Sequence, residues 1–187
     1  GTVGGLEEDV DVQPPLSESN EDEEIASFQT DNVALIFFAR EVGTKLELLL
    51  TEETRHDPVR DVFSVPVPKT MAHKAAATRF LHKELNLEDR QLLFLHRLKD
   101  AAPPQTGVYV SMLPVKNQER VLRGESPLRL PDHSNFVDLE VVATGVASNS
   151  STFGPHVAQH LKSVIKFLQP WVVTAGKAAG ACAAMLD

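Results

Sequence analysis

The chain has 187 residues, of which 42% are hydrophobic, and it carries a formal net charge of −8. This length and composition suit one domain with a sizeable core plus a tail, and they exclude a wholly disordered chain. The single cysteine, Cys182, excludes an intrachain disulfide and a cysteine-based zinc site.

The negative charge is concentrated in residues 1–30, which hold nine of the 26 acidic residues and no Lys or Arg. The other 17 acids stand against 18 Lys and Arg, so the rest of the chain is close to neutral. A strong nonspecific affinity for nucleic-acid phosphates needs a clear basic excess, which the domain lacks. The acidic segment buries little by composition, so it is interpreted as a solvated extension or as an arm that orders on a partner.

The first ten residues, GTVGGLEEDV, do not have the pattern of a signal peptide or of an Arg-rich presequence. No run of about 18 apolar residues occurs, so no membrane-spanning segment is expected. These observations favour an intracellular soluble protein.

The domain is predicted to begin with a β-hairpin. Residues 32–41 (NVALIFFARE) form a dense apolar run with β-branched and aromatic members, which predicts a buried strand. Gly43 supports a turn, and residues 45–53 supply the second strand.

A loop is expected over residues 54–61, followed by a short strand over residues 62–68 (VFSVPVP). Pro66 and Pro68 cannot donate to a sheet, so they are expected to confine this strand to an edge or to end it.

A helix is predicted next, with Thr70 as its N-cap. Ala77, Leu81 and either Glu84 or Leu85 follow at helical spacing, and Asn86 tolerates the left-handed conformation that closes a helix.

Two further strands are predicted at residues 90–98 and 107–116, on either side of a turn-rich stretch. Residues 117–135 are polar and irregular, with a short helix expected around residues 119–123. Residues 135–147 (NFVDLEVVATGVA) are rich in β-branched residues and are predicted as another strand.

The last helix has the clearest pattern. Ser150, Ser151 or Thr152 is expected to cap it, and Pro155 suits its first turn. Pro170 is expected to end it. Its core-facing stripe is predicted to contain Val157, Leu161, Val164, Ile165 and Leu168.

This order of elements predicts an α+β fold, an α/β/α sandwich around a mixed sheet. The predicted organisation is an acidic extension at residues 1–30, a domain at residues 31–170, and a tail rich in small residues at residues 171–187, which is expected to form a loose helix.

Residues 75–87 (AAATRFLHKELNL) resemble the end of the Nudix box, G-x5-E-x7-R-E-U-x-E-E-x-G-U, where U is apolar. With the motif arginine placed on Arg79, Leu81 and Leu87 match its apolar positions and Glu84 matches its last glutamate. The predicted order of elements over residues 32–169 also resembles the Nudix fold, a mixed sheet with the box helix and a C-terminal helix.

The other box positions depart from the family. Val65 and Asn86 stand at the two glycines, and Met71, Phe80 and Lys83 stand at three of the four glutamates. Nudix enzymes hold Mg²⁺ or Mn²⁺ on these carboxylates to neutralise a diphosphate and activate water. The resemblance therefore implies a vestigial box, Arg79 and Glu84, with no metal, no cofactor and no catalysis.

Nudix-like domains with degenerate boxes serve as parts of ribonucleoprotein assemblies, as in the mitochondrial large ribosomal subunit. The resemblance thus implies a non-catalytic scaffold or recognition subunit of an RNA-containing assembly, expected in mitochondria, with protein partners docking through residues 1–30 and 171–187. One alternative is a module that binds a nucleotide or an RNA 5′ end without cutting it. Another is an unrelated α+β domain with a chance Arg–Glu helical pair.

A residual diphosphate hydrolase is a further alternative. It would draw carboxylates from outside the box, the candidates being Glu119, Glu125, Asp138 and Glu140.

Other candidate groups form no complete site in the sequence. His156 and His160 have a metal-compatible i, i+4 spacing but no evident third ligand, so an exposed polar face is expected. His73 and His82 are expected to face solvent. Ser111 and Cys182 have no visible base partner, which leaves nucleophilic catalysis unsupported.

One basic concentration occurs between residues 116 and 129, interpreted as an RNA contact or as a mixed-charge surface loop. Its members are Lys116, Arg120, Arg123 and Arg129.

Overall fold

The computed structural model describes residues 32–53, 58–87, 95–98, 105–112, 129–174 and 180–186, with residues 171–174 described by their backbone alone. The described strands are β2 (Asn32–Val42), β3 (Lys45–Glu52), β4 (Arg60–Asp61), β5 (Phe63–Val67), β6 (Leu95–Leu98), β7 (Thr106–Met112) and β8 (Ser134–Asp138). The described helices are α2 (His73–Leu85), α4 (Leu139–Ala147), α5 (Pro155–Thr174) and α6 (Ala181–Ala184).

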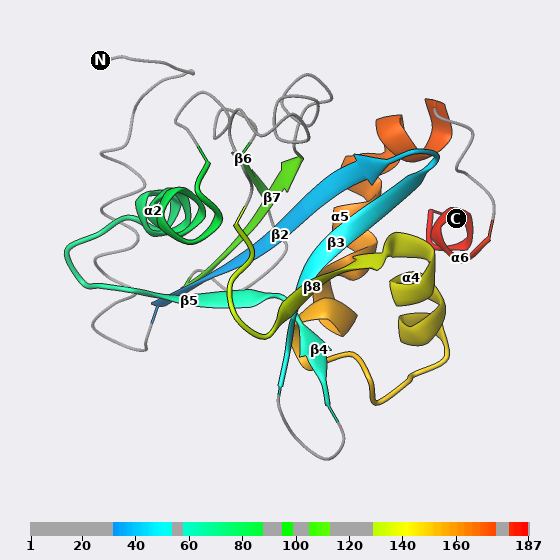
Figure 1. Ribbon diagram of the computed structural model, residues 1–187, viewed down its shortest axis with the longest axis horizontal. Helices are drawn as coiled ribbons and strands as arrows, with labels where there is room; N and C mark the ends of the chain where they lie inside the picture. The colour runs from blue at the N-terminus through cyan, green and yellow to red at the C-terminus, as the bar shows by residue number, and fades with distance from the viewer. Residues whose placement is uncertain are drawn as a thin grey trace.

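Strand β2 is the centre of a mixed sheet (Figure 1). It pairs in parallel with β7 and antiparallel with two strands, β3 next to its C-terminal end and β5 next to its N-terminal end. Strand β6 extends the sheet beyond β7, and β4 and β8 both pair with β3. The predicted hairpin and edge strand are confirmed, as is the α+β class.

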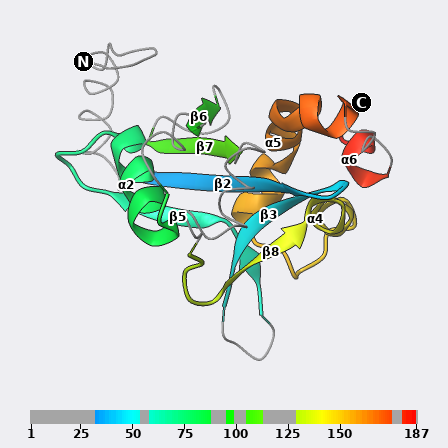
Figure 2. The ribbon, with the colours of Figure 1, turned by 45° about the horizontal axis from the view of Figure 1, so that its top comes forward.

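Both faces of β2 are buried, with residues 34–39 all at 1% exposure or less. Leu35, Phe37 and Ala39 belong to one core, and the residues between them belong to the other. Helix α2 covers one face of the sheet, while α4, α5 and α6 lie on the opposite side (Figure 2). A strand in parallel pairing is covered on both faces in this way, which gives the predicted three layers.

The predicted stripe of α5 is confirmed, because its five apolar residues are all fully buried against the sheet. Each such burial contributes about 1.5–3 kcal/mol relative to exposure, so this helix is a main source of stability. The stripe is made of Val157, Leu161, Val164, Ile165 and Leu168.

The N-terminus of α5 is capped from a distant strand. One carboxylate oxygen of Asp61 accepts hydrogen bonds from the N–H groups of Val62 and Val157, both at 2.9 Å, and the other accepts a longer one of 3.4 Å from His156. A Cβ added at Gly154 would lie 2.2 Å from the Asp61 carboxylate, so only glycine leaves room for it. The expected cap in residues 150–152 was therefore wrong.

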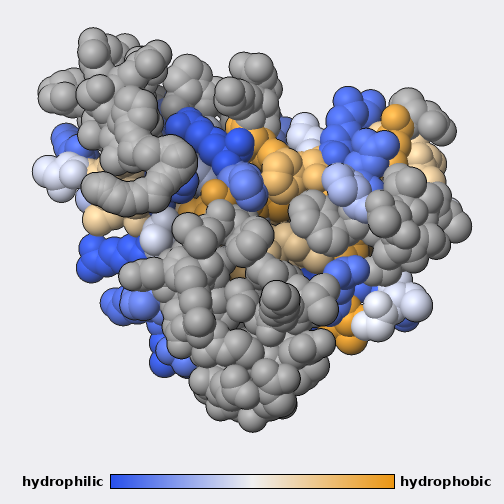
Figure 3. Space-filling model, turned by 90° about the horizontal axis from the view of Figure 1, so that it is seen from above, coloured by the Kyte–Doolittle hydropathy of each residue, from blue (hydrophilic) through white to orange (hydrophobic). Residues whose placement is uncertain are grey.

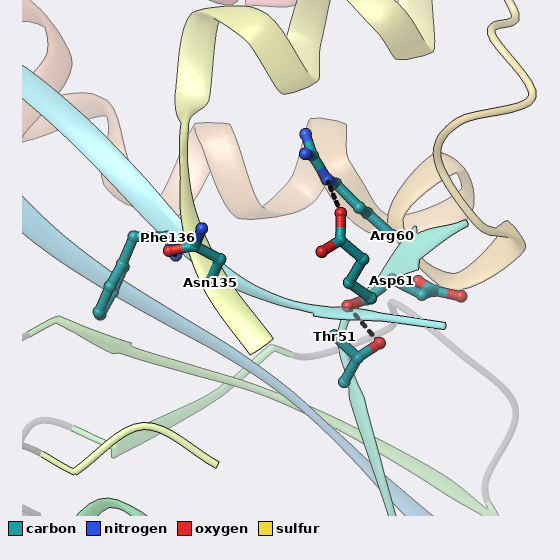
Figure 4. A network of polar contacts seen from close by, with 6 residues as sticks. Thr51, Arg60, Asp61, Asn135 and Phe136 are labelled. Atoms are coloured by element: carbon teal, nitrogen blue, oxygen red, sulfur yellow. Dashed lines mark hydrogen bonds and ion pairs between the residues drawn. The ribbon is translucent and has the colours of Figure 1, made fainter. Parts of the chain in front are cut away.

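The polar contacts around β4 fix this cap in place. The Thr51 hydroxyl donates to the Asp61 carbonyl at 3.0 Å, and the Arg60 guanidinium donates to Glu52 at 3.2 Å (Figure 4). The Arg60 backbone also bonds to the loop before α5, accepting from Gly154 and donating to Thr152. Residues 60–61, predicted as loop, thus form a short strand that joins β3 to α5.

Residues 139–147 form helix α4, so the strand predicted over residues 135–147 is wrong for most of its length. The observed strand, β8, covers only residues 134–138. The Asp138 carboxylate caps the helix by accepting from the Glu140 N–H at 2.8 Å. Leu139, Val142 and Ala143 are buried at helical spacing. This packing outweighs the β preference of the valines, which is a weak tendency.

Pro170 does not end α5, which continues to Thr174. A proline removes one hydrogen bond of the helix and crowds the carbonyl four residues earlier, a cost that can be borne without ending the helix. The boundary expected at residue 170 therefore lies inside a helix.

The described end of the chain is attached to α4 through Glu140. Its carboxylate accepts hydrogen bonds from the N–H groups of Ala181 at 2.8 Å and Cys182 at 3.1 Å, at the start of α6. Gly180 makes this approach possible, since its φ is +81° and an added Cβ would lie 2.4 Å from the same carboxylate. Cys182 is buried in the core beneath.

No helix among the described residues is long and apolar enough to cross a membrane. Seen from above, the described surface has hydrophobic residues between hydrophilic groups on its two sides (Figure 3).

We expect Asp61→Ala to lower the free energy of unfolding by about 1–2 kcal/mol, because the first N–H groups of α5 lose their acceptor. Asp61→Asn should recover most of this loss, since asparagine also caps helices well. Urea unfolding monitored by circular dichroism measures both changes. Asp132→Ala, at an exposed turn position, is the control, and equal midpoints for Asp61→Ala and Asp132→Ala would contradict the capping role.

Candidate recognition groove

A groove of about 490 Å³ lies between β5 and α2. One wall is the edge strand β5, with the side chains of residues 63–66, and the other is the outer side of α2. Pro131 also lines the groove.

The positions that define the box in the Nudix motif come together in this groove. Val65 and Met71 line it from the segment before the helix. Arg79, Phe80, Lys83 and Glu84 line it from α2, where spacings of one, four and five residues place them on one side. The buried residues Ala76, Ala77, Leu81 and Leu85 pack the helix against the sheet.

The ends of α2 differ from each other in how they are capped. At the start, the N-cap is Ala72 and makes no side-chain hydrogen bond, so the expected Thr70 cap was wrong. At the end, Asn86 has φ 58° and ψ 38°, which confirms the predicted left-handed closure. The Arg129 guanidinium donates to the backbone carbonyls of Lys83 and Glu84. The backbone N–H of Arg129 donates to the carbonyl of Leu85 at 3.2 Å.

The lining of the groove is apolar with cationic groups beside it. The rings of Phe63 and Phe80 pack with their centroids 4.9 Å apart. Arg79 and Lys83 are exposed, and Glu84 is half-buried. Among the described residues, Arg79 and Glu84 do not form the helical ion pair that the sequence suggested as an alternative.

Within the described part of the chain, no three His, Cys, Asp or Glu side chains are grouped so that they could hold a metal ion. Glu84 is the one acid among the residues that line the groove. Mg²⁺ requires several oxygen ligands in near-octahedral geometry. The lining of the groove therefore supplies one carboxylate, that of Glu84.

The acids considered as substitute ligands have structural contacts away from the groove. Asp138 caps α4 and lies 3.4 Å from the ammonium of Lys45. Glu140 holds the start of α6. Glu119 and Glu125 lie outside the described residues.

The histidines do not form the expected exposed set. His73 is fully buried, and its Nε2 lies 2.9 Å from the carbonyl oxygen of Gln105, so it connects α2 to the start of β7. His82 is exposed as expected, with Nδ1 2.6 Å from the Leu87 carbonyl oxygen. His156 is half-buried and His160 is only 2% exposed, so these two do not share a solvent face.

The two candidate nucleophiles are both buried. Ser111 lies inside β7 at 1% exposure. Burial, the hydrogen bond with Glu140 and the charges of Glu140 and Asp138 raise the pKa of the Cys182 thiol far above its usual range. The thiolate is the reactive form of cysteine, so Cys182 is unsuited to nucleophilic catalysis.

Of the predicted basic patch, the structure describes Arg129 alone, and its guanidinium contacts the end of α2. Lys116, Arg120 and Arg123 lie outside the described residues. Sequence reasoning did not find the part that β5 plays as a groove wall, because Phe63 and Phe80 are 17 positions apart and meet only in the folded chain.

No protein-family model matches the chain, and no curated protein matches it in sequence. The structure is similar to that of the C. elegans Ap4A hydrolase, with a TM-score of 0.49 at 15% identity over 75% of this chain and 99% of that chain. It is also similar to the Nudix domain of Shewanella oneidensis NrtR bound to ADP ribose, with a TM-score of 0.47 at 10% identity over 83% and 98%. A T. brucei MERS1–RNA complex has a TM-score of 0.47 at 14% identity over 86% and 68%.

These similarities concern the fold alone, at sequence identities of 10–15%.

We expect Cys182 to react with iodoacetamide at least tenfold more slowly than a free thiol at pH 8, because it is buried and its pKa is raised. Glu140→Gln should accelerate the reaction, since it weakens the acceptor that holds α6 in place. Mass spectrometry over time measures both rates. Asp132→Asn, at an exposed turn position, is the control, and rapid alkylation of the unmodified chain would contradict the burial.

Proposed function

We propose that this protein is a non-catalytic Nudix-like module that uses the groove between α2 and β5 for recognition. The supporting observation is that the four glutamate positions of the box all line one groove, and three of them hold Met71, Phe80 and Lys83. The chain keeps the geometry of the site while replacing the groups that the chemistry of the family requires.

The replacements disfavour a metal for three separate reasons. Phe80 offers no ligand atom, and the thioether of Met71 is a soft ligand that hard cations avoid. Lys83 adds a positive charge beside the one remaining carboxylate, Glu84. A cation there would meet repulsion where it needs several oxygens, so activation of water on a metal is unsupported.

The proposed setting is a large RNA-containing assembly in the mitochondrion, where the protein acts as a scaffold or recognition subunit. Its support is the resemblance to Nudix-like domains of such assemblies together with the exposed cations beside the groove. Co-purification of mitochondrial RNA with a tagged chain from isolated mitochondria is expected, and recovery of the chain without RNA would contradict this setting.

A nucleotide or RNA 5′-end binding module is the second candidate, favoured by the combination of Arg79 and Phe80 in one groove. Aromatic rings stack on bases and guanidinium groups bind phosphates bidentately. A residual hydrolase is a further alternative, and it requires carboxylates from outside the described residues.

If the groove has no metal chemistry, the unmodified chain should bind no Mn²⁺ at millimolar concentration. It should also release no phosphate from nucleoside diphosphate derivatives. The variant carrying Met71→Glu, Phe80→Glu and Lys83→Glu should gain Mn²⁺ affinity by at least tenfold, measured by electron paramagnetic resonance. The corresponding three glutamine substitutions are the control for polarity without charge. Hydrolysis by the unmodified chain that is lost in Glu84→Gln would overturn the proposal.

For the nucleotide-binding candidate, we expect isothermal titration calorimetry with ADP or a capped dinucleotide to show saturable heat. Phe80→Ala and Arg79→Ala should each weaken the binding by about tenfold, since each removes one contact of roughly 1–3 kcal/mol. Lys162→Ala, on the exposed side of α5, is the control. The absence of heat for any nucleotide would leave the scaffold function and reject this candidate.

A further inference from the structure

We propose that the groove between α2 and β5 is occupied by an acidic stretch of this same chain, residues 21–28 (EDEEIASF), which lies outside the described residues. This inference rests on the proposed function, in which the groove is a recognition surface. It names the occupant and adds a regulation, because a partner would have to displace the chain's own segment.

The groove has the form of a site for an extended peptide. Strand β5 pairs with β2 along one edge, and no other described strand pairs with it. The groove therefore joins an edge strand to a helix, an arrangement in which added peptides bind through the main chain of the strand and through side-chain pockets. Phe63, Val65 and Phe80 supply the apolar lining.

The charge of the groove selects an acidic peptide. Arg79 and Lys83 lie four residues apart on the exposed side of α2, and the described residues include no ion-pair partner for either. With Glu84, the lining has a net positive charge. Residues 21–24 are four consecutive acids, followed by the apolar Ile25 and Phe28.

The point of attachment brings the segment to the groove. Asn32, the first described residue after the segment, pairs with Val67 at the end of β5. A strand of five residues is roughly 17 Å long, and four residues cover roughly 13 Å when extended. Residues 21–28 can therefore lie along the whole groove with no more than three residues between Phe28 and Asn32.

The order of groups along the segment also matches the groove. Phe80 packs on Phe63, which lies at the end of β5 opposite Val67. Arg79 and Lys83 lie within one helical turn of Phe80, so they are remote from Val67. Running back from Asn32, Phe28 and Ile25 come first and the four acids come last. Phe28 and Ile25 thus lie along the part of β5 nearer Val67, and the acids reach Arg79 and Lys83 next to Phe80.

Attachment makes even a weak interaction sufficient. A short flexible connection gives an effective concentration on the order of 1 mM. With an intrinsic dissociation constant of about 100 µM, the segment would occupy the groove about nine-tenths of the time and weaken a competing peptide about tenfold.

The test titrates a fluorescein-labelled peptide of residues 18–31 into the full chain and follows its anisotropy. Changing Glu21, Asp22, Glu23 and Glu24 to their amides should tighten binding of the peptide about tenfold. The matched control changes Glu7, Glu8, Asp9 and Asp11 to their amides, which alters net charge equally and should leave the affinity unchanged.

A second pair of variants locates the binding site. In the chain with residues 21–24 neutralised, Arg79→Glu with Lys83→Glu should abolish binding of the peptide. Lys162→Glu with Lys166→Glu, an exposed pair at the same spacing on α5, should not.

Equal affinity of the labelled peptide for the unmodified and neutralised chains would overturn occupation by the chain's own segment and leave the groove as a recognition surface. Equal tightening in both neutralised variants would attribute the effect to net charge and also overturn it. No binding to any variant would exclude acidic peptides as occupants. None of these results touches the proposed absence of catalysis, which the hydrolysis and Mn²⁺ measurements decide separately.

Discussion

The burial of β2 on both faces is the constraint on which the rest of the structure depends. Residues 34–39 are inaccessible to water, so the sheet must be covered by helices on each side. Parallel pairing with β7 uses one edge of the strand, while β3 and β5 divide the other edge between them. This division leaves β5 at the margin of the sheet, beside α2, where it becomes the wall of the groove.

Three acidic residues of the domain hold helices in place. Asp61, Asp138 and Glu140 each accept hydrogen bonds from N–H groups at the start of a helix. Such groups have no partner inside the helix and carry the positive end of its dipole, so a carboxylate stabilises them well. The contacts of Asp61 and Glu140 also join segments far apart in sequence, and both require a nearby glycine.

The groove brings together residues at positions that match the Nudix box. Those on α2 converge because the helical spacing that places them together also buries Leu81 and Leu85 in the core. Their side chains now form an apolar surface with two exposed cations. A surface of this kind binds aromatic, apolar and acidic groups, which is why recognition by the groove is proposed in place of hydrolysis.

The sequence alone was sufficient for the α+β class, the first hairpin, the edge strand, the closure of α2 at Asn86 and the buried stripe of α5. Each of these depends on local periodicity, on a proline or on a turn residue, and such signals act over a few neighbouring positions. Arg79 and Glu84 were expected on one helix, and both lie on α2. Tertiary structure decided the helix at residues 139–147, the continuation of α5 through Pro170, and the burial of His73 and His160. It also decided the cap that Asp61 provides and the groove between Phe63 and Phe80, because contacts between distant residues leave no periodic trace in the chain.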